Sequence, residues 1–257
     1  MSAPAGTAIF DLDGVVYLGG TGIAGAGQAL HTLRDSGWHL LFATNNASAT
    51  AVSVAEKITR LTGFTPSESA VVTCAMAAAS YLRGSTAPVF VVGEPALRST
   101  LADGGLSVTE EPEDAEAVVV GIDFSFTYDR MKDATAAIRS GATFIATNTD
   151  ATYPTPRGLA PGAGSIVAAV RTASGQAPIV VGKPEQPMID LLAERIEGEA
   201  VWVVGDRPET DIAMAQRAGW RSILPLTGVI GSAAELTGPD IPEVVVDSIV
   251  HVPDIIL

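Results

Sequence analysis

Short apolar runs alternate with amphipathic segments along nearly the whole chain. A short apolar run is typical of a strand buried on both faces of a sheet, and such runs predict strands at 8–10, 39–43, 89–92, 117–120, 143–146, 179–181, 201–204, 222–224 and 244–246. Apolar residues at helical spacing predict helices between them, at 27–35, 49–61, 75–82, 95–102, 128–139, 165–172, 187–195 and 209–217. This alternation predicts an α/β fold with mainly parallel sheets covered by helices.

Two breaks rich in Gly, Ser and Pro divide this pattern. They are "RGSTAP" at 83–88 and "SGQAP" at 174–178, and the block between them has strand–helix units of its own. We therefore predict a smaller α/β domain inserted at 85–177, while residues 1–84 and 178–257 together form the main domain.

Strong polar residues directly follow four of the predicted strands outside this block. The carboxyl ends of parallel strands meet at one edge of a sheet, where open α/β folds bind ligands. The sequence therefore predicts that carboxylates, a hydroxyl and a lysine converge on one crevice. The residues are Asp11 with Asp13, Thr44 with Asn45 and Asn46, Lys183, and Asp206 with Asp211.

The pair Asp11 and Asp13 is unusual because both carboxylates follow an apolar strand with a single residue between them. Alternate residues of an extended chain point the same way, and two anions about 5 Å apart repel by about 3 kcal/mol at an effective dielectric constant near 20. A hard divalent cation between them removes this repulsion, and Mg²⁺ often uses one or two carboxylates plus substrate phosphate. We predict Asp11 and Asp206 as its ligands, with Asp211 orienting them or a bound water.

These groups suit phosphoryl transfer. Asp11, beside a metal and Lys183, can attack phosphorus and form an aspartyl-phosphate. Asp13 can protonate the leaving oxygen and later activate water. Lys183 supplies positive charge for the phosphate, and Thr44 supplies a hydroxyl donor.

The composition narrows the choice of partner. A formal net charge of -14 with 15 Lys and Arg argues against nucleic acid or an anionic membrane. The single cysteine, Cys74, excludes a disulfide framework. The first residues lack the basic and apolar regions of a secretion signal, and no apolar run approaches the ~18 residues of a membrane span. We expect a cytoplasmic protein that acts on a small molecule, and the sequence leaves a homo-oligomer open.

The stretches "DLDGV", "TNN", "GKP" and "GDRPETD" resemble, in this order, the four motifs of the haloacid dehalogenase-like (HAD) hydrolase superfamily. The resemblance implies a Rossmann-like core, at 1–84 and 178–257, and an inserted cap domain at 85–177. It also implies a Mg²⁺-dependent phosphohydrolase in which Asp11 is the nucleophile and Asp13 the general acid and base.

The same resemblance implies the ligands of the site. Mg²⁺ would be held by Asp11, the backbone carbonyl of Asp13 and Asp206, with Asp211 in support, while Thr44 and Lys183 would bind the phosphate. One departure is visible, since Pro208-Glu209 stand where relatives often have Leu-Asp.

The middle block resembles the cap of subfamily IIA, which includes NagD-like, p-nitrophenyl phosphatase-like and glycerol phosphate phosphatase-like enzymes. The resemblance rests on "VVGEPAL", "VVVGIDFSFTYDRM" and "FIATNTDATYP". Residues 148–165 are polar and rich in Gly and Pro, so we predict a long loop that selects the substrate, with Asp150 and Arg157 as its candidate binding residues. A cap implies a small phosphomonoester, and the scarcity of aromatic residues favours a sugar or polyol phosphate.

Several of these residues have simpler interpretations when each is taken alone. Thr44 fits the cap of a following helix, Asp211 fits a helix start, and Lys183 fits an ordinary surface lysine. Asn45 stays open between capping and binding the substrate through its backbone N–H. The "GTGIAG" stretch at 20–25 matches a dinucleotide fingerprint, but it lies several residues after the strand, which favours a flexible loop beside the nucleophile.

Other functions on the same fold also stay open. A phosphotransferase or phosphomutase would use the same acids and shield the aspartyl-phosphate from water. A catalytically silent protein that binds a phosphorylated metabolite is a third alternative. A dehalogenase has no need of the second acid, so Asp13 argues against it.

Overall fold

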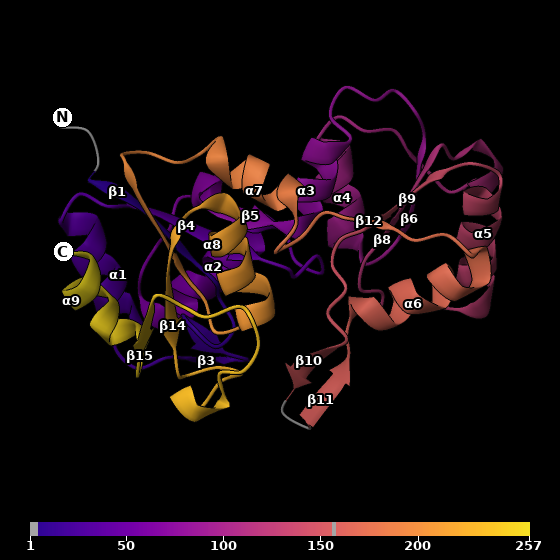
Figure 1. Cartoon of the computed structure of the whole chain (residues 1–257). Coiled ribbons are helices and arrows are strands. Elements are labelled where there is room, and N and C mark those ends of the chain that lie inside the picture. Colours follow the sequence, from indigo (N-terminus) through magenta and orange to yellow (C-terminus); the bar gives the residue numbers. More distant parts are fainter. Residues whose placement is uncertain (1–4, 156–157) are drawn as a thin grey trace. The chain divides into compact units, whose positions relative to one another are not determined.

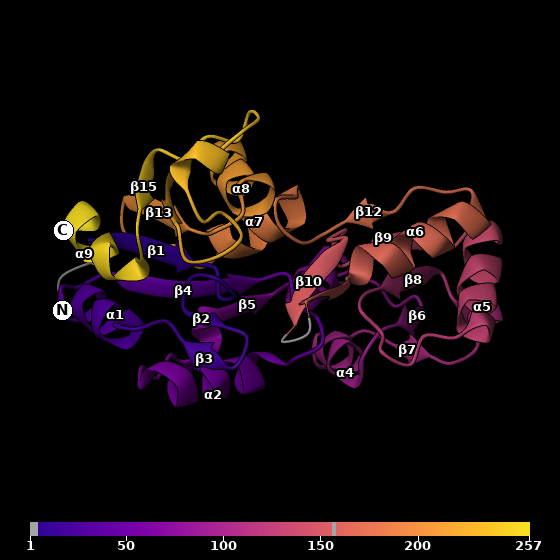
Figure 2. The same ribbon diagram turned by 90° about the horizontal axis from the view of Figure 1, so that it is seen from below.

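The computed structural model describes residues 5–155 and 158–257, and Figures 1 and 2 show it from two directions. Contacts divide the chain into two compact units. The first unit comprises the residues up to Thr44 together with Ala51–Val72 and Ile189–Leu257. The second comprises Asn45–Thr50 and Thr73–Met188. Each unit is built around one sheet, which confirms the predicted α/β fold.

A six-stranded sheet with the strand order β15-β14-β13-β1-β4-β5 forms the centre of the first unit. Strand β1 pairs in parallel with β4 on one side and with β13 on the other. The chain continues outward from β1 through β4 and β5, and outward from β13 through β14 and β15. The strand order therefore reverses between β1 and β13, which is where open α/β sheets bind ligands. The strands are β1 (Gly6–Phe10), β4 (His39–Thr44), β5 (Val71–Thr73), β13 (Ala200–Val204), β14 (Arg221–Pro225) and β15 (Val244–Val246).

Helices cover both faces of this sheet, which explains why β1 is buried along its whole length. In Figure 2, α1 (Ala26–Asp35) and α2 (Ala51–Thr62) lie on one side of the sheet and α8 (Ala213–Ala218) lies on the other. A short helix, α9 (Val252–Ile256), contacts α1. A hairpin of β2 (Tyr17–Leu18) and β3 (Thr21–Gly22) follows β1 and contacts α2.

A five-stranded sheet with the order β12-β9-β8-β6-β7 forms the centre of the second unit, and all its neighbouring strands are parallel. An antiparallel hairpin of β10 and β11 follows β9. The strands are β6 (Val89–Val92), β7 (Val108–Thr109), β8 (Ala117–Val120), β9 (Thr143–Ala146), β10 (Thr152–Thr155), β11 (Gly158–Pro161) and β12 (Ile179–Val180). The helices are α3 (Cys74–Tyr81), α4 (Pro95–Asp103), α5 (Tyr128–Arg139) and α6 (Ala163–Ser174).

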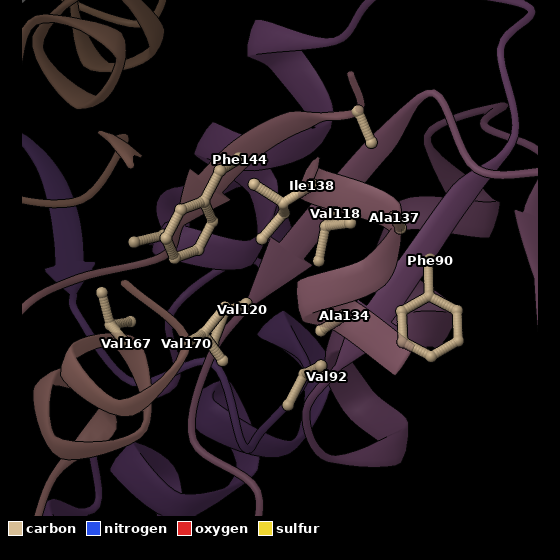
Figure 3. Packing of buried hydrophobic residues seen from close by; sticks show 12 residues of the cluster. Phe90, Val92, Val118, Val120, Ala134, Ala137, Ile138, Phe144, Val167 and Val170 are labelled. Atoms are coloured by element: carbon tan, nitrogen blue, oxygen red, sulfur yellow. The ribbon is translucent and has the colours of Figure 1, made fainter. Parts of the chain in front are cut away.

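The core of the second unit lies between this sheet and helices α5 and α6, as Figure 3 shows. Its fully or largely buried aromatic members are Phe90 and Phe144, and Val118 of β8 with Ala134 and Ile138 of α5 lie between them. The alternation of large and small side chains lets the helices approach the sheet closely.

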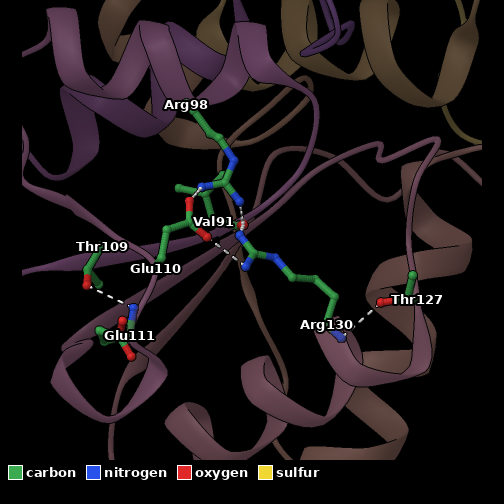
Figure 4. A network of polar contacts seen from close by, with 7 residues as sticks. All are labelled: Val91, Arg98, Thr109, Glu110, Glu111, Thr127 and Arg130. Atoms are coloured by element: carbon green, nitrogen blue, oxygen red, sulfur yellow. Dashed lines mark hydrogen bonds and ion pairs between the residues drawn. The ribbon is translucent and has the colours of Figure 1, made fainter.

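Two arginines donate hydrogen bonds to strand β6 on the edge that β7 leaves uncovered, because β7 pairs only with Val89 and Phe90. Beyond that pairing, the carbonyl of Val91 accepts hydrogen bonds from Arg98 (2.8 Å) and Arg130 (2.6 Å). Both guanidinium groups also pair with the carboxylate of Glu110, as Figure 4 shows. These two side chains occupy the place that a longer β7 would take.

Single turns complete the chain, together with α7 (Gln186–Ala193), which begins in the segment of the second unit and ends in that of the first. The turns are η1 (Glu68–Ala70), η2 (Pro112–Asp114), η4 (Ala233–Glu235), η5 (Ile249–His251) and the π-helical turn η3 (Pro208–Ile212). Within the described residues, no helix is long and apolar enough to cross a membrane.

The boundaries of the two units differ from the predicted domains, which place residues 45–50, 73–84 and 178–188 in the main domain. The contacts group these segments with the inserted block, because α3 packs on α4 and β12 pairs with β9. As functional domains, the catalytic core and the cap stay a prediction.

Two expectations about individual segments were wrong. The strand before Lys183 does not join the sheet that carries Asp11, because Ile179 and Val180 pair with Ile145 and Ala146 of β9. Residues 148–165 are not one long loop either, because Thr152–Thr155 pair with Gly158–Pro161 as an antiparallel hairpin and α6 begins at Ala163.

Candidate active site

Three carboxylates gather where the strand order of the first unit reverses. Asp11 follows β1, and Asp206 and Asp211 follow β13. Oxygen atoms of the three side chains lie within 4.8 Å of one another. Asp206 and Asp211 are each only 1% exposed, and Asp11 is half-buried. Three anions so close together fit a hard divalent cation with oxygen ligands.

Asp11 is placed by the sheet itself. Its backbone N–H donates to the carbonyl of Val204 at 2.8 Å, which extends the β1–β13 pairing by one residue. Asp206 comes two residues after Val204, so the two carboxylates emerge from neighbouring strand ends.

Two glycines and one backbone amide hold Asp206. The N–H of Val229 donates to Oδ2 of Asp206 at 2.7 Å, and the other oxygen, Oδ1, is buried. A methyl group on Gly14 or Gly228 would lie closer than 3.0 Å to the Asp206 carboxylate, a distance that real side chains avoid. The hydroxyl of Thr227 donates to the carbonyl of Gly14 at 2.6 Å, and this bond joins the two segments.

The loop after β14 was missed by the sequence interpretation. Its "LTGV" stretch follows an apolar strand as the other four polar stretches do. The same strand-end rule could therefore have found Thr227. Gly228 contributes the space that its missing side chain leaves for Asp206, and Val229 contributes a backbone N–H. Neither contribution can be recognised from a side chain in the sequence.

The sequence allows two interpretations of Asp211, a helix start and a place beside the metal ligands, and the structure has features of both. Asp211 lies in the π-helical turn that begins at Pro208, and its Oδ2 accepts a hydrogen bond from the N–H of Arg207 at 3.2 Å. It therefore satisfies a backbone donor at the start of this turn and belongs to the carboxylate cluster as well. Such π turns are frequent at functional sites.

Asp13 lies in the turn after β1 and is not one of the three clustered carboxylates. Its Oδ1 accepts a hydrogen bond from the N–H of Gly19 in the β2–β3 hairpin at 3.0 Å. This hairpin occupies part of the stretch expected to be a flexible loop.

Tyr17 and Lys57 lie near enough to Asp13 for its charge to affect the pKa of both. The ammonium of Lys57 lies 3.8 Å from the centre of the Tyr17 ring. Burial raises the pKa of Tyr17 well above its usual range, and the charges of Asp13 and Asp11 add to the effect. Burial also lowers the pKa of Lys57, while the charge of Asp13 acts in the opposite direction. The sequence interpretation missed both residues.

Thr44 ends strand β4 and is 8% exposed. The next helix, α2, begins only at Ala51, so the helix-capping interpretation of Thr44 is wrong. Asn46 makes a local turn instead, because its Oδ1 accepts from the N–H and the hydroxyl of Ser48 at 2.8 and 2.7 Å.

A second group of predicted residues gathers in the second unit. Lys183 is only 4% exposed, which excludes the surface-lysine interpretation. Asn45 bonds to both sides of its backbone, accepting from the Lys183 N–H at 2.8 Å and donating to the Lys183 carbonyl at 3.1 Å. The Asn45 amide also donates to Asp150 at 3.4 Å.

The backbone of Asn45 is held in turn by two buried side chains that the sequence did not single out for this role. Its carbonyl accepts from the amide of Asn148 at 2.7 Å and from the thiol of Cys74 at 2.9 Å. Cys74 is buried as expected, and burial raises its pKa to about 12. The thiol therefore keeps its proton and acts as a donor.

The structure thus brings Asp11, Asp206 and Asp211 together in one unit and Asn45, Asp150 and Lys183 together in the other. That these two groups serve one pocket stays a prediction. Arg157 lies outside the described residues.

Comparison with known proteins points to one family. The family model described as haloacid dehalogenase-like hydrolase matches residues 8–107, and a second, described as HAD-hydrolase-like, matches residues 180–252. The chain is 44% identical to D-glycerol 3-phosphate phosphatase of Mycobacterium tuberculosis over 86% of its length, and it spans 63% of the length of that relative. It is 39% identical to the 5'-nucleotidase YutF of Bacillus subtilis over 86% of this chain and 87% of that one.

A solved structure shows the same fold. Glycerol phosphate phosphatase of Mycobacterium tuberculosis, in complex with magnesium, superimposes with a TM-score of 0.88 at 38% identity, over 97% of this chain and 77% of that one.

Proposed function

This chain belongs to the haloacid dehalogenase-like hydrolases, and on that premise we propose that it is a Mg²⁺-dependent phosphatase. It hydrolyses a small-molecule phosphomonoester through an aspartyl-phosphate on Asp11. The observation that supports this most directly is the cluster of Asp11, Asp206 and Asp211 at the point where the strand order reverses.

The donor set suits Mg²⁺ because it consists of carboxylate oxygens, two of them on buried side chains. Asp11, Asp206 and Asp211 would hold the ion, with the backbone carbonyl of Asp13 completing the set on the protein side. When bound, the ion supplies positive charge that stabilises the transferring phosphoryl group.

The reaction has two steps. In the first, a carboxylate oxygen of Asp11 bonds to phosphorus while the bond from phosphorus to the ester oxygen breaks, and protonated Asp13 gives its proton to the departing alcohol. In the second, Asp13 takes a proton from water and the water oxygen bonds to phosphorus while the bond from the Asp11 oxygen to phosphorus breaks, which releases inorganic phosphate and restores the Asp11 carboxylate.

The position of Asp13 supports this division of roles. Its side chain is held by Gly19 in the hairpin and lies outside the three-carboxylate cluster. A carboxylate that is not used by a cation stays available for proton transfer.

We assign the remaining roles from the order of the motifs. Lys183 and Thr44 bind the phosphate, and Asp150 and Arg157 contact the alcohol part of the substrate. Asn45 acts through its side-chain bonds to Lys183, and the next subsection develops this role.

A polyol or sugar phosphate is our favoured substrate, because D-glycerol 3-phosphate phosphatase is among the relatives at 44% identity. A nucleoside monophosphate is the second candidate. It is supported by the 5'-nucleotidase relative and by the ring pair of Phe124 and Tyr153, whose centroids lie 6.2 Å apart. Phe124 is 64% exposed and could stack on a base.

A hydrolysis panel tests the proposal. Purified protein is given glycerol 3-phosphate, hexose phosphates and nucleoside monophosphates with Mg²⁺, and released phosphate is measured with and without EDTA. We expect Mg²⁺-dependent release that Asp11→Asn abolishes, whereas Asp35→Asn, on the exposed end of α1, leaves it unchanged. Transfer of phosphate to an added sugar in place of water would show a phosphotransferase, and binding without turnover would show a silent protein.

A further inference from the structure

Strands β9 and β12 lie side by side, so the segments that follow them leave the sheet together. Their pairing continues past β12, because the N–H of Val181 donates to the carbonyl of Ala146 at 3.0 Å. Gly182 then passes so close to Asn45 that a methyl group at this position would lie 2.6 Å from Asn45 Oδ1. Only a residue without a side chain brings Lys183 this close to Asn45.

The Asn45 amide uses all its hydrogen-bonding groups in this position. Its oxygen accepts from the Lys183 N–H at 2.8 Å, and its nitrogen donates to the Lys183 carbonyl at 3.1 Å and to Asp150 at 3.4 Å. An amide offers one acceptor oxygen and two N–H donors, so neither a carboxylate nor a hydroxyl reproduces the set. The bonds on both sides of the Lys183 Cα fix the direction in which its side chain leaves the chain.

Asn148 extends this arrangement into the loop after β9. Its amide nitrogen donates to the Asn45 carbonyl at 2.7 Å, and its oxygen accepts from the N–H of Asp150 at 3.0 Å. Asn148 is 4% exposed, so both bonds are shielded from water, which makes their loss costly. Cys74, the first residue of α3, donates to the same Asn45 carbonyl.

We propose that Asn45 is a positioning residue that aims Lys183 at the phosphate of the substrate, and that Asn148 couples this lysine to the loop that carries Asp150. The proposal deepens the proposed function and rests on it for the role of Lys183. It gives the Asn45 side chain a role that neither of the two open interpretations, capping and substrate binding through the backbone N–H, included.

The proposal predicts how variants differ in kinetics. Loss of the Asn45 amide removes the bonds that fix the Lys183 backbone while its charge stays, and a shift of about 1 Å in a positioned group can lower the rate about 100-fold. We expect Asn45→Ala to lower kcat/KM about 10- to 100-fold and to raise the inhibition constant of inorganic phosphate. The loss should be the same for esters of different alcohols, because the lysine contacts their common phosphate.

A double-mutant cycle separates positioning from a general loss of structure. In a Lys183→Met background, Asn45→Ala should cause no further change in phosphate inhibition, because the group that it positions is already gone. The matched control is Gln176→Ala, which removes an amide that bonds to the Ile138 carbonyl in the same unit and should leave kinetics unchanged. Full additivity of Asn45→Ala and Lys183→Met would overturn the proposal.

Hydrogen exchange provides a readout that does not depend on turnover. The Lys183 amide should exchange faster in Asn45→Ala than in the wild type, because its acceptor is removed, and Gln176→Ala should not change it. If the wild type hydrolyses no ester, the proposed function fails, while this result still decides whether Asn45 holds the Lys183 backbone. Unchanged exchange at Lys183 in Asn45→Ala would refute the positioning role of Asn45 even in an active phosphatase.

Discussion

Replacing Gly228 by alanine is the sharpest test of how the carboxylate cluster is held. Gly228 is not in the left-handed region, so its backbone accepts alanine without strain. The new methyl group, however, would lie closer than 3.0 Å to the Asp206 carboxylate, and real side chains avoid such contacts. Either Asp206 or the loop of Thr227 and Val229 must move.

The size of the effect follows from the contacts that the movement breaks. Restoring an ordinary distance displaces the carboxylate or the loop by more than about 1 Å, and a displacement of about 1 Å can already lower the rate about 100-fold. The charged hydrogen bond from the Val229 N–H, 2.7 Å long, is lengthened as well, and such bonds contribute about 1.5–3 kcal/mol. We therefore expect the half-saturating Mg²⁺ concentration to rise about 10- to 100-fold, as is typical when the support of a metal ligand is disturbed.

The assay is a Mg²⁺ titration of phosphate release, with the melting temperature measured on the same samples. Gly231→Ala is the control, because a methyl group there would lie no closer than 3.7 Å to its neighbour, Glu235. If Gly228→Ala keeps the wild-type Mg²⁺ dependence while folding normally, the assignment of Asp206 as a metal ligand is refuted. If both variants weaken Mg²⁺ equally, the loop as a whole is responsible and the steric argument fails.

Three other predictions concern the pair of Lys57 and Tyr17, the thiol of Cys74, and Arg130 on the edge of β6. Lys57→Met removes the cation that lies over the Tyr17 ring and interacts with Asp13. A cation over a ring contributes about 0.5–1 kcal/mol or more, so kcat should fall about 2- to 10-fold. Tyr17→Phe keeps the ring and should match the wild type in steady-state assays. Because burial raises the pKa of Cys74 to about 12, the unfolded chain ionises first, and wild-type stability should fall with rising pH above about 8.5, by roughly 1 kcal/mol per pH unit more than in Cys74→Ala. Arg130→Leu should lower unfolding stability by about 1 kcal/mol, with activity unchanged, because one donor to Val91 is lost.

Each of these has a contrary result. Equal losses in Lys57→Met and Tyr17→Phe would show that the phenol oxygen matters more than the ring. Parallel curves of unfolding free energy against pH for wild type and Cys74→Ala, from urea titrations, would show that the thiol is not held protonated. A loss of activity in Arg130→Leu would connect the edge of β6 to catalysis.

Much of the fold follows from local pattern. The apolar runs identified the central strands of both sheets, because strands covered on both faces must be apolar throughout. The same runs could not tell which sheet a strand joins, since pairing depends on partners far away in the chain. This is why the strand before Lys183 was placed in the wrong sheet.

The site followed from the strand-end rule as far as side chains carry the chemistry. The clustering of Asp11, Asp206 and Asp211 could be predicted because the carboxyl ends of parallel strands meet at one edge of a sheet. Gly228 could not be predicted, because its contribution is the space that it leaves for Asp206. For Asn45 the residue was singled out but the acting group was not, since side chain and backbone N–H are indistinguishable in a sequence.

The two arginines on the edge of β6 have a consequence beyond the unit that they stabilise. An open strand edge with apolar residues is a template on which a strand of another molecule can pair, and this is a common route to aggregation. Arg98 and Arg130 occupy the Val91 carbonyl and place charge beside it, so an incoming strand meets cations and finds this acceptor already taken. The edge of a valine-rich strand is thereby blocked, at this position, as a template for pairing.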